Sequence, residues 1–482
     1  MIYAIAGSGG KTGLIHEMAD RYRSEGKKVF VTTSTHMMIE DDMLLEDDAE
    51  LITERLLSTG YVMAGLPSEY ESKFGPLSYS TYDKVCQAAD VVFVEADGSK
   101  HMPLKFPYPH EPVIYPNTNE IIIVTGLYAA GLRLCEVTYN AETAASCLAC
   151  EDTSIITPEM IQTLLRRGYL DMLSEAYPEM KISVHAALSP KEGISAGAAA
   201  SEPALYMRAL KALIERDIDV SIIRKEWFDP MPRLFICGAG HVATELAQMA
   251  GILEFGITVM DDRAEYADAS RLPTADRVIC DSFDNLSSYL EPGAFYVVVT
   301  RGHADDYSCV KQIITTEYSY LGMIGSRMKV ARTMEMLEAD LKAYGLDPKV
   351  LDDVHAPIGL SIGAQTPAEI AVSILAEIIK VKNLTPSSSA SKELLESDET
   401  GVLCIITGKT GSSPRGVGSI MLVSDNKVID TIGGGAIEAC VIEDARSTKD
   451  VTEREYNLGD EEVKRVGMIC GGSDKVLFIP IS

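Results

Sequence analysis

A glycine-rich loop near the start of the chain, Gly7-Ser8-Gly9-Gly10-Lys11-Thr12, has the residue types that bind phosphate. It ends in Gly-Lys-Thr, but Ile5 stands where a full P-loop has its first glycine. In such loops the backbone N–H groups surround the phosphate, the lysine supplies positive charge and the threonine can ligate Mg²⁺. The alternative is a turn that only caps a helix. The predicted phosphate-binding residues are Gly7, Gly9, Gly10, Lys11 and Thr12.

Two acidic residues, Glu95 and Asp97, follow the apolar run Val91–Val94. Carboxyl ends of parallel strands meet at one edge of a sheet, so these acids should lie beside the glycine loop. We expect Thr12, with Glu95 or Asp97, to hold Mg²⁺ directly or through water. No residue in the sequence is obviously placed to position a water molecule for hydrolysis.

A second glycine turn, Gly238-Ala239-Gly240, lies between an apolar strand and a helix, with Ala243 in the third small position. The next strand ends in Asp261-Asp262. This strand–turn–helix–strand–acid order is typical of a Rossmann dinucleotide site, in which the pyrophosphate lies on the helix N-terminus. An acid at this position suits a ribose 2′-hydroxyl and repels a 2′-phosphate. The alternative is a Rossmann-like domain that binds no dinucleotide.

Two polar loops should face the same crevice, because each follows a later strand of the same sheet. The first contains Arg301 and His303, and the second contains Ser326 and Arg327. His303 is the candidate acid or base. The predicted ligand-binding residues of this crevice are Gly238, Gly240, His241, Asp261, Arg301, Ser326 and Arg327.

The last hundred residues or so carry three further glycine-rich loops. Their glycines indicate either a close approach of the backbone to a ligand or tight turns in a small sheet domain. Cys470, flanked by glycines, is the most suggestive thiol, because such a cysteine can react or ligate a soft metal or sulfur species. The predicted site residues here are Arg415, Gly434, Gly435, Cys470 and Gly471.

The elements around these loops predict an α/β chain of three domains. Strands alternate with helical stretches in residues 1–224, which indicates a P-loop-like doubly wound domain. Residues 225–385 form the Rossmann domain, and a serine-rich linker leads into 386–482, a small, mostly β (α+β) domain. Residues 157–216 look helical and amphipathic in parts, and the segment around Trp227 reads as a short linker.

Composition narrows the function classes. The net charge of −28 argues against binding to nucleic acid or to an anionic membrane surface. No apolar run is long enough to span a bilayer, and the first residues do not resemble a signal peptide. Ten scattered cysteines, with Cys147 and Cys150 as the one CxxC pair, fit a reducing compartment. We therefore expect a cytoplasmic protein.

Several motifs resemble a known family. The segments GAGHVATELAQMA, TRGHADD, GMIGSRMK and HAPIGLSIGAQTPAEIAVSILAEII look like the Rossmann domain of the xanthine dehydrogenase accessory (XdhC/CoxI) family. TGSSPRGVGSIMLV, IGGGAIEACVIEDA and GMICGGSDKVLFIP look like the small domain of that family. The small domain usually comes first, whereas here it follows. AGSGGKTGLI, VTTSTHM and VEADGSKHMPLKFP are similar to YqeC-type accessory proteins, which are linked to selenium-dependent molybdenum hydroxylases.

The resemblance implies a protein that matures a xanthine dehydrogenase-type molybdenum hydroxylase. Such a protein would bind the molybdenum–pterin cofactor transiently, support its sulfuration or selenation, and deliver it to the apoenzyme. Its partners would be that apoenzyme and a sulfur or selenium donor enzyme, and we expect a homodimer. Two other functions remain open: an NAD-dependent oxidoreductase using His303 or His241, and an ATP-dependent kinase or ligase using Lys11. The cofactors that these sites could take are NAD(P), and ATP or GTP with Mg²⁺. Whether the chain is an enzyme is undecided.

Overall fold

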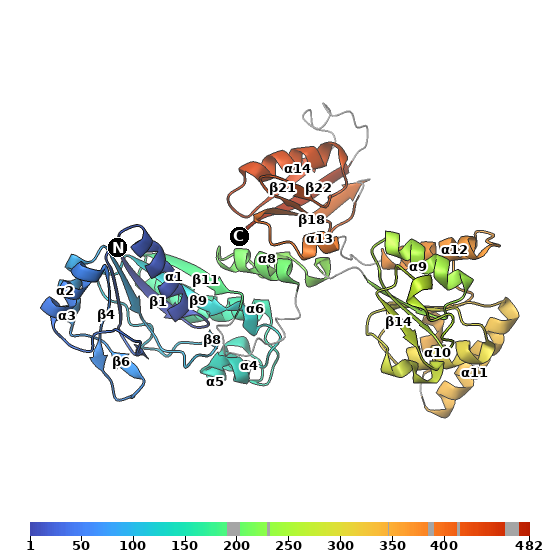
Figure 1. Ribbon diagram of the computed structural model, residues 1–482, viewed down its shortest axis with the longest axis horizontal. Helices are drawn as coiled ribbons and strands as arrows, with labels where there is room; N and C mark the ends of the chain where they lie inside the picture. The colour runs from blue at the N-terminus through green and yellow to red at the C-terminus, as the bar shows by residue number, and fades with distance from the viewer. Residues whose placement is uncertain (190–202, 229–231, 346, 384–389, 412–414, 458–471) are drawn as a thin grey trace.

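The computed structural model describes the chain except for residues 190–202, 229–231, 346, 384–389, 412–414 and 458–471. It contains two large parallel sheets with helices and one antiparallel sheet with a helix on one face (Figure 1). The predicted α/β fold class is therefore confirmed. None of the helices in these described ranges is both long and apolar enough to cross a membrane.

The first sheet has six parallel strands in the order β11-β9-β1-β7-β2-β4. Strands β1, β2, β7 and β9 are buried along almost their whole length, as expected when helices cover both faces. The strands are β1 (Ile2–Gly7), β2 (Val29–Thr33), β4 (Tyr61–Met63), β7 (Val91–Glu95), β9 (Glu120–Gly126) and β11 (Lys181–Ala187). Smaller strands are β3 (Met37–Met38), β5 (Leu66–Pro67), β6 (Lys73–Gly75), β8 (Leu104–Lys105) and β10 (Thr138–Tyr139).

Helices surround this sheet. They are α1 (Lys11–Ser24), α2 (Ala49–Thr59), α3 (Tyr79–Ala88), α4 (Leu134–Val137), α5 (Ala141–Leu148), α6 (Pro158–Leu165), α7 (Asp171–Ala176) and α8 (Ala204–Ile214). Residues 157–216, predicted to be helical and amphipathic in parts, also contain the edge strand β11, whose side chains are mostly half-buried. A half-buried edge strand gives a weak period-two signal between two strongly helical segments, which is why the pattern did not reveal it.

The second sheet is also parallel, in the order β14-β13-β12-β15-β16-β17. This is the doubly wound order of a dinucleotide-binding fold, with the switch point between β12 and β15. The strands are β12 (Arg233–Cys237), β13 (Gly256–Asp261), β14 (Arg277–Cys280), β15 (Phe295–Val298), β16 (Tyr320–Met323) and β17 (Val354–His355). The helices are α9 (His241–Ile252), α10 (His303–Ile313), α11 (Arg327–Ala343) and α12 (Pro367–Lys382). A capping box formed by Thr366 and Glu369 begins α12.

The third sheet is antiparallel, in the order β20-β19-β18-β22-β21. Its elements are α13 (Lys392–Leu395), β18 (Gly401–Gly411), β19 (Ile420–Val423), β20 (Val428–Ile429), α14 (Gly435–Ser447), β21 (Thr452–Asn457) and β22 (Gly472–Ile481). Helix α14 packs on one face through an apolar cluster that includes Ile437 and Val441.

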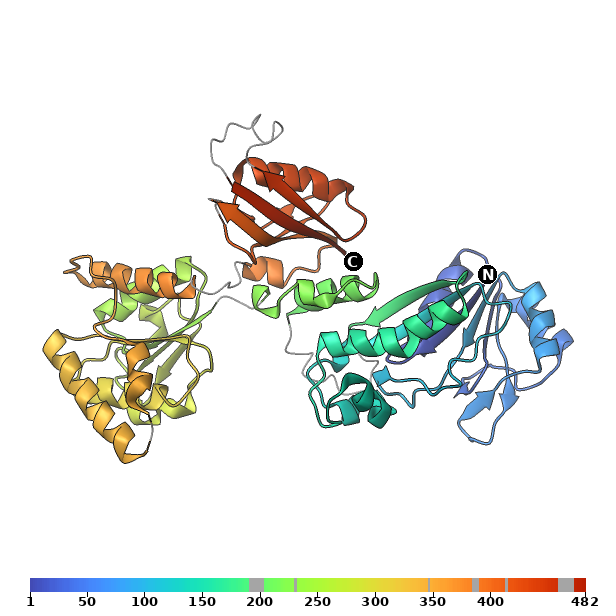
Figure 2. The same cartoon turned by 180° about the vertical axis from the view of Figure 1, so that it is seen from behind.

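Helix α8 covers the other face of this third sheet, although it belongs to the N-terminal part of the chain (Figures 1 and 2). Nine of its eleven residues are buried. Arg208 donates to the carbonyls of Ser397 and Glu399 at 2.8 and 2.6 Å. Trp227 is also buried, and a Cβ at Gly418 would lie 2.6 Å from its ring. The segment predicted as a short linker thus packs into a core that joins the first and third sheets.

Candidate functional site

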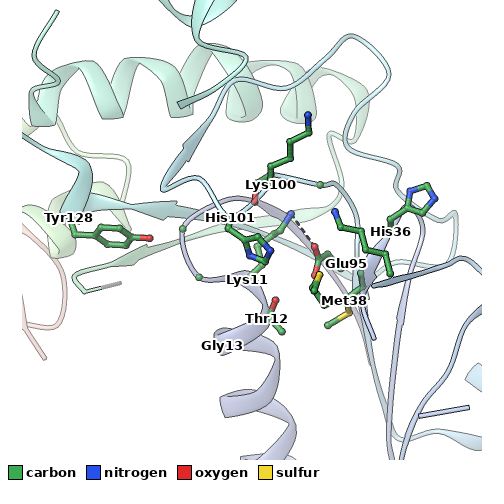
Figure 3. Close-up of a pocket in the computed structure, with 15 residues that line it drawn as sticks. Lys11, Thr12, Gly13, His36, Met38, Glu95, Lys100, His101 and Tyr128 are labelled. Carbon is green, nitrogen blue, oxygen red and sulfur yellow. Dashed lines mark ion pairs between the residues drawn. The ribbon is translucent and has the colours of Figure 1, made fainter. Parts of the chain in front are cut away.

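A pocket lies at the carboxyl edge of the first sheet, around the loop between β1 and α1 (Figure 3). Lys11, Thr12 and Gly13 form the first turn of α1, and the Lys11 ammonium is directed toward Glu95. The lining residues are Gly9, Gly10, Lys11, Thr12, Gly13, His36, Met37, Met38, Lys73, Glu95, Gly98, Ser99, Lys100, His101 and Tyr128.

The loop requires glycine at two of its positions. Gly7 and Gly9 have φ of +89° and +85°, a region that other residues rarely adopt. A Cβ at Gly9 would lie 2.5 Å from the backbone nitrogen of Gly126, and one at Gly7 would lie 2.1 Å from the carbonyl of Val124. The loop is therefore pressed against the end of β9, which fixes its path.

The N-terminus of α1 offers donors to a ligand. Gly10 precedes the helix and has no side chain to cap it, and the first turn contains no acid. The first N–H groups of an α-helix have no partner within the helix, and its dipole favours an anion there. Since Gly10, Lys11 and Thr12 all line the pocket, this arrangement suits a phosphate group.

The Lys11 side chain is buried and paired with acids. Its Nζ lies 2.5 Å from Asp97 Oδ1 and 3.4 Å from Glu95 Oε1, and it also donates to the Asp97 carbonyl. Burial by itself would lower the pKa of Lys11, but the charges of Asp97 and Glu95 outweigh it and raise the pKa above its usual value. Lys11 is therefore a fixed cation at the base of the pocket.

Asp97 is fully buried, and both of its oxygens accept hydrogen bonds or ion pairs. Besides Lys11, it receives Tyr169 Oη at 2.8 Å, Gly7 N at 3.1 Å and Lys105 Nζ at 3.2 Å. Burial works against ionisation, but the charges of Lys11 and Lys105 hold the pKa of Asp97 below its usual range. Asp97 thus anchors the loop. The predicted role of Asp97 as a Mg²⁺ ligand stays a prediction. Because these donors already occupy both of its oxygens, Asp97 could ligate a cation only by giving up one of them.

Glu95 is differently placed. Its Oε2 is buried and has no hydrogen-bond partner among the described residues, and the residue lines the pocket. Burial raises the pKa of Glu95 despite the nearby Lys11 charge. An unpartnered buried oxygen fits a bound cation, so Glu95 and Thr12 are the groups best placed to ligate Mg²⁺. The part of the chain that the structure describes holds no group of three or more His, Cys, Asp or Glu side chains that could bind a metal ion by themselves.

Several basic groups complete the pocket. His36, Lys73, Lys100 and His101 line it, and Lys100 and His101 are consecutive residues with φ of 48° and 62°. Two non-glycine residues in the left-handed region are uncommon and are often found at functional sites. The predicted site residues do not include Lys73, Tyr128, Lys105 or Tyr169. No motif marks Lys73, Tyr128 or Tyr169, whereas Lys105 lies in the quoted segment VEADGSKHMPLKFP and could have been found there.

The predicted Rossmann crevice lies at the carboxyl edge of the second sheet. Gly238 has φ of +108°, and a Cβ there would lie 2.5 Å from the carbonyl of Val299. A Cβ at Gly240 would meet no described atom within 4 Å, so the space beside it is open. Helix α9 begins at His241, directly after this turn. The fold thus provides the turn and helix N-terminus that a pyrophosphate requires.

The acid predicted to bind ribose is engaged within the protein. Asp261 is buried and accepts from Ala239 N at 2.7 Å and from Arg263 N at 3.0 Å. The Arg263 guanidinium adds two bonds, at 2.9 and 3.0 Å. Burial opposes ionisation, but the bonds from Arg263 lower the pKa of Asp261 below its usual value. Arg263 was not among the predicted site residues, although it directly follows the acidic pair.

The loops after β15 and β16 meet through two hydrogen-bonded groups. His303 Nδ1 lies 3.0 Å from Thr333 Oγ1, and its Nε2 is buried without a partner in the described ranges. Buried Asp306 accepts from Thr300 Oγ1 at 2.5 Å and pairs with Lys329. Ser326 caps α11, and Arg301 pairs with Asp262 at 2.9 Å. The predicted residues His303, Ser326 and Arg301 thus occupy the same edge of the sheet, as do Arg327 and His241.

In the third unit, Glu438 organises the triple-glycine loop. It accepts from the N–H groups of Ile432 and Gly434, both at 3.0 Å, and from the Thr431 hydroxyl. Gly434 and Gly435 begin α14 with φ of 72° and 74°, and Arg415 is half-buried beside the glycine loop before β19. Cys470 and Gly471 lie outside the described residues.

The pocket residues around Lys11 all come from the first unit, and the Rossmann unit stands apart from it (Figures 1 and 2).

Three family models match the chain in succession. The first, the YqeC protein family, matches residues 3–142. The XdhC Rossmann domain matches residues 234–378, and the XdhC and CoxI family matches residues 394–455. The resemblances stated from the motifs are therefore confirmed, including the order in which the XdhC and CoxI segment follows the Rossmann domain.

Curated relatives match parts of the chain. The uncharacterized protein YqeB of Escherichia coli is 32% identical over 41% of this chain and 36% of its own length. A probable xanthine dehydrogenase component of Bacillus subtilis is 31% identical over 32% of this chain and 44% of its own. The uncharacterized protein YqeC of Escherichia coli is 30% identical over 28% of this chain and 54% of its own. The chain thus spans between a third and about half of the length of each relative.

Solved structures overlap only in part. A xanthine dehydrogenase from Bacillus halodurans is 28% identical, with a TM-score of 0.29, over 32% of this chain and 46% of that one. The chuY protein of Escherichia coli is 14% identical, with a TM-score of 0.22, over 33% of this chain and 92% of that one.

Proposed function

We propose that this chain is an accessory protein for the maturation of a molybdenum hydroxylase of the xanthine dehydrogenase type, and that its N-terminal unit binds a phosphorylated ligand. The matched XdhC, CoxI and YqeC segments support the accessory role. The observation that carries the binding site is the buried Lys11 at the base of a glycine loop whose helix N-terminus opens into the same pocket.

The residues present fit the phosphate of a molybdenum–pterin cofactor or of a nucleotide. Gly10, Lys11 and Thr12 would hold the phosphate, and the unpartnered Glu95 Oε2 suits an accompanying Mg²⁺. When bound, the molybdenum–pterin cofactor would supply the metal centre that receives sulfur or selenium. The thiol proposed as its soft ligand, Cys470, lies outside the described residues. The proposed partners are the apoenzyme and a sulfur or selenium donor enzyme. We also propose that the chain acts as a homodimer in the cytoplasm.

A second candidate is ATP- or GTP-dependent phosphoryl transfer at the same loop, favoured by the combination of Lys11, Thr12 and Glu95 in one pocket. It predicts steady Mg²⁺-dependent nucleotide hydrolysis or transfer that is lost in Lys11→Met. An oxidoreductase function has weaker support, because the described crevice places His303 against Thr333 rather than against a second acid or base.

The direct test is activation of apoenzyme. A xanthine dehydrogenase-type hydroxylase is produced with and without this chain, and its molybdenum content, cyanide-labile sulfur or selenium, and activity are measured. We expect activity to depend on the chain and to fall with Lys11→Met. Lys27→Met is the control, because Lys27 is exposed beyond the far end of α1. Equal activity with and without the chain would refute the accessory role.

A further inference from the structure

The end of β13 is arranged differently from a site for an unphosphorylated ribose. A carboxylate has about four lone-pair positions for donors. Asp261 receives four donors from the protein: Ala239 N, Arg263 N, Arg263 Nε and an Arg263 Nη. Its side chain is 2% exposed. No acceptor position remains for the hydroxyl groups of a ribose.

The second acid of the pair is also engaged. Asp262 Oδ2 lies 2.9 Å from Arg301, and its Oδ1 lies 3.8 Å from Arg263 Nε. The 3.8 Å separation is an ion-pair distance and not a hydrogen bond, so Asp262 keeps acceptor capacity, but each of its oxygens has a guanidinium beside it. The charges of both acids are therefore compensated by arginines, and Asp261 has no free acceptor where an NAD site needs one.

Cations dominate this end of the strand. The Arg263 guanidinium lies 3.6 Å from the centre of the Tyr266 ring, and Arg271 lies 4.6 Å from the same ring. Together with Arg301 they place three guanidinium groups near the pair Asp261 and Asp262. The carboxylate of Asp281, whose backbone N–H bonds to the Asp261 carbonyl, accepts from Asn285 and Tyr289 instead. The Arg263 guanidinium has five N–H donors. Two of them, one on Nε and one on an Nη, bond to the Asp261 carboxylate, so three remain for a ligand. Stacking and bidentate pairing hold this donor set in one orientation.

The glycine turn of the crevice leaves space for a phosphate group, since a Cβ at Gly240 would meet no described atom within 4 Å. The open space beside Gly240 and the start of α9 at His241 suit a pyrophosphate. Arg263 follows the strand end at which the adenosine ribose lies in this fold. A planar guanidinium with free donors at that point matches a phosphate monoester better than a neutral hydroxyl.

We propose that the Rossmann crevice binds a dinucleotide that carries a 2′-phosphate on its adenosine ribose, of the NADP class, in preference to NAD. Arg263 and Arg301 contact that phosphate. Asp261 positions Arg263 and holds the glycine turn through Ala239 N. This inference concerns the second unit alone and does not depend on the function proposed above.

The test uses the full chain and isothermal titration with NADP⁺, NAD⁺, 2′,5′-ADP and 5′-AMP. Since hydrogen bonds to charged groups are among the stronger ones, NADP⁺ should bind roughly 10- to 100-fold more tightly than NAD⁺, and 2′,5′-ADP more tightly than 5′-AMP. The comparison needs no variant, so it is independent of any folding defect. Equal affinities, tighter NAD⁺, or no binding of any of the four at millimolar concentration would overturn the proposal.

A variant identifies the residue responsible. Arg263→Gln should remove most of the preference by weakening NADP⁺ while leaving NAD⁺ affinity within a few-fold. Arg277→Gln is the matched control, because Arg277 is exposed at the start of β14, at the opposite edge of the sheet, and lies over Tyr289. An unchanged preference in Arg263→Gln, or equal losses in the two variants, would contradict the role of Arg263.

Discussion

Lys11 and Asp97 are separated by 86 positions in the sequence, yet Lys11 Nζ lies 2.5 Å from Asp97 Oδ1 in the buried base of the pocket. Asp97 also receives Lys105 and Tyr169, so a single carboxylate ties the glycine loop to both of these residues. The pairing keeps the lysine charged and immobile beneath the helix N-terminus.

Replacing Asp97 should destabilise the first unit strongly. Asp97→Asn leaves two buried lysines without their shared counter-charge, and breaking such an arrangement costs about 3–5 kcal/mol. Urea unfolding followed by hydrogen exchange of the β1 and β7 peptides measures the loss. Asp90→Asn is the control, since Asp90 is largely exposed beside Lys28. Similar stabilities of the two variants would contradict the role given to Asp97.

Gly9→Ala tests the path of the loop. The variant places a Cβ 2.5 Å from Gly126 N and Pro103 O and should cost about 1–3 kcal/mol beyond the backbone strain, with weakened phosphate binding. Gly26→Ala has a similar positive φ but meets no described atom within 4 Å, so it reports the strain alone. Thermal melting and phosphate titration of both variants separate the two effects. Identical behaviour would mean that the loop is not constrained by β9.

The pairing of Asp261 with Arg263 predicts a pH dependence. The folded pKa of Asp261 is lowered, so its ion pair stabilises the fold fully above the unfolded pKa, about 3.9, and loses that contribution as pH falls through the lower folded value. Hydrogen exchange of the β12–β13 peptides should therefore be faster in Asp261→Asn than in the native chain at about pH 6. The difference should shrink below about pH 4. A difference that grows on acidification would contradict this sign.

Arg208 links α8 to the third unit. Arg208→Met removes the bonds to the carbonyls of Ser397 and Glu399, and we expect faster hydrogen exchange in α13 and in the start of β18. Arg216→Met is the control, since the Arg216 side chain, just beyond the end of α8, donates to the Ala212 carbonyl of that helix and, among the described residues, to no group of the third unit. Unchanged exchange in α13 would mean that the two units share less of their core than the structure indicates.

Local patterns predicted the strands and glycine turns well, because buried parallel strands read as apolar runs and tight turns require glycine. The apolar run Val91–Val94, for example, lies within β7 (Val91–Glu95). What the sequence did not reveal depends on long-range contacts. Tyr169 joins Asp97 from 72 positions away, and α8 packs across two sheets although its own pattern is only that of a buried helix.

Asp97 and Asp261 also show that a local sequence pattern does not predict which partners a buried acid will have. Asp97 lies just after β7 and Asp261 is the last residue of β13, so the sequence predicts that both face a ligand. In the structure each binds a neighbouring cation and a loop N–H. For Asp261 the signal was present, since Arg263 follows two residues later. For Asp97, Lys105 lies in the same quoted segment VEADGSKHMPLKFP, and only Tyr169 has no local signal.

Native mass spectrometry of the chain, purified anaerobically with its bound ligands, tests the central claim most directly. We predict a phosphorylated ligand, either a molybdenum–pterin or a nucleotide, that is retained by the native chain and by Lys27→Met but lost from Lys11→Met. A chain that carries no phosphorylated ligand, or a Lys11→Met variant that retains it at the native level, would contradict the claim.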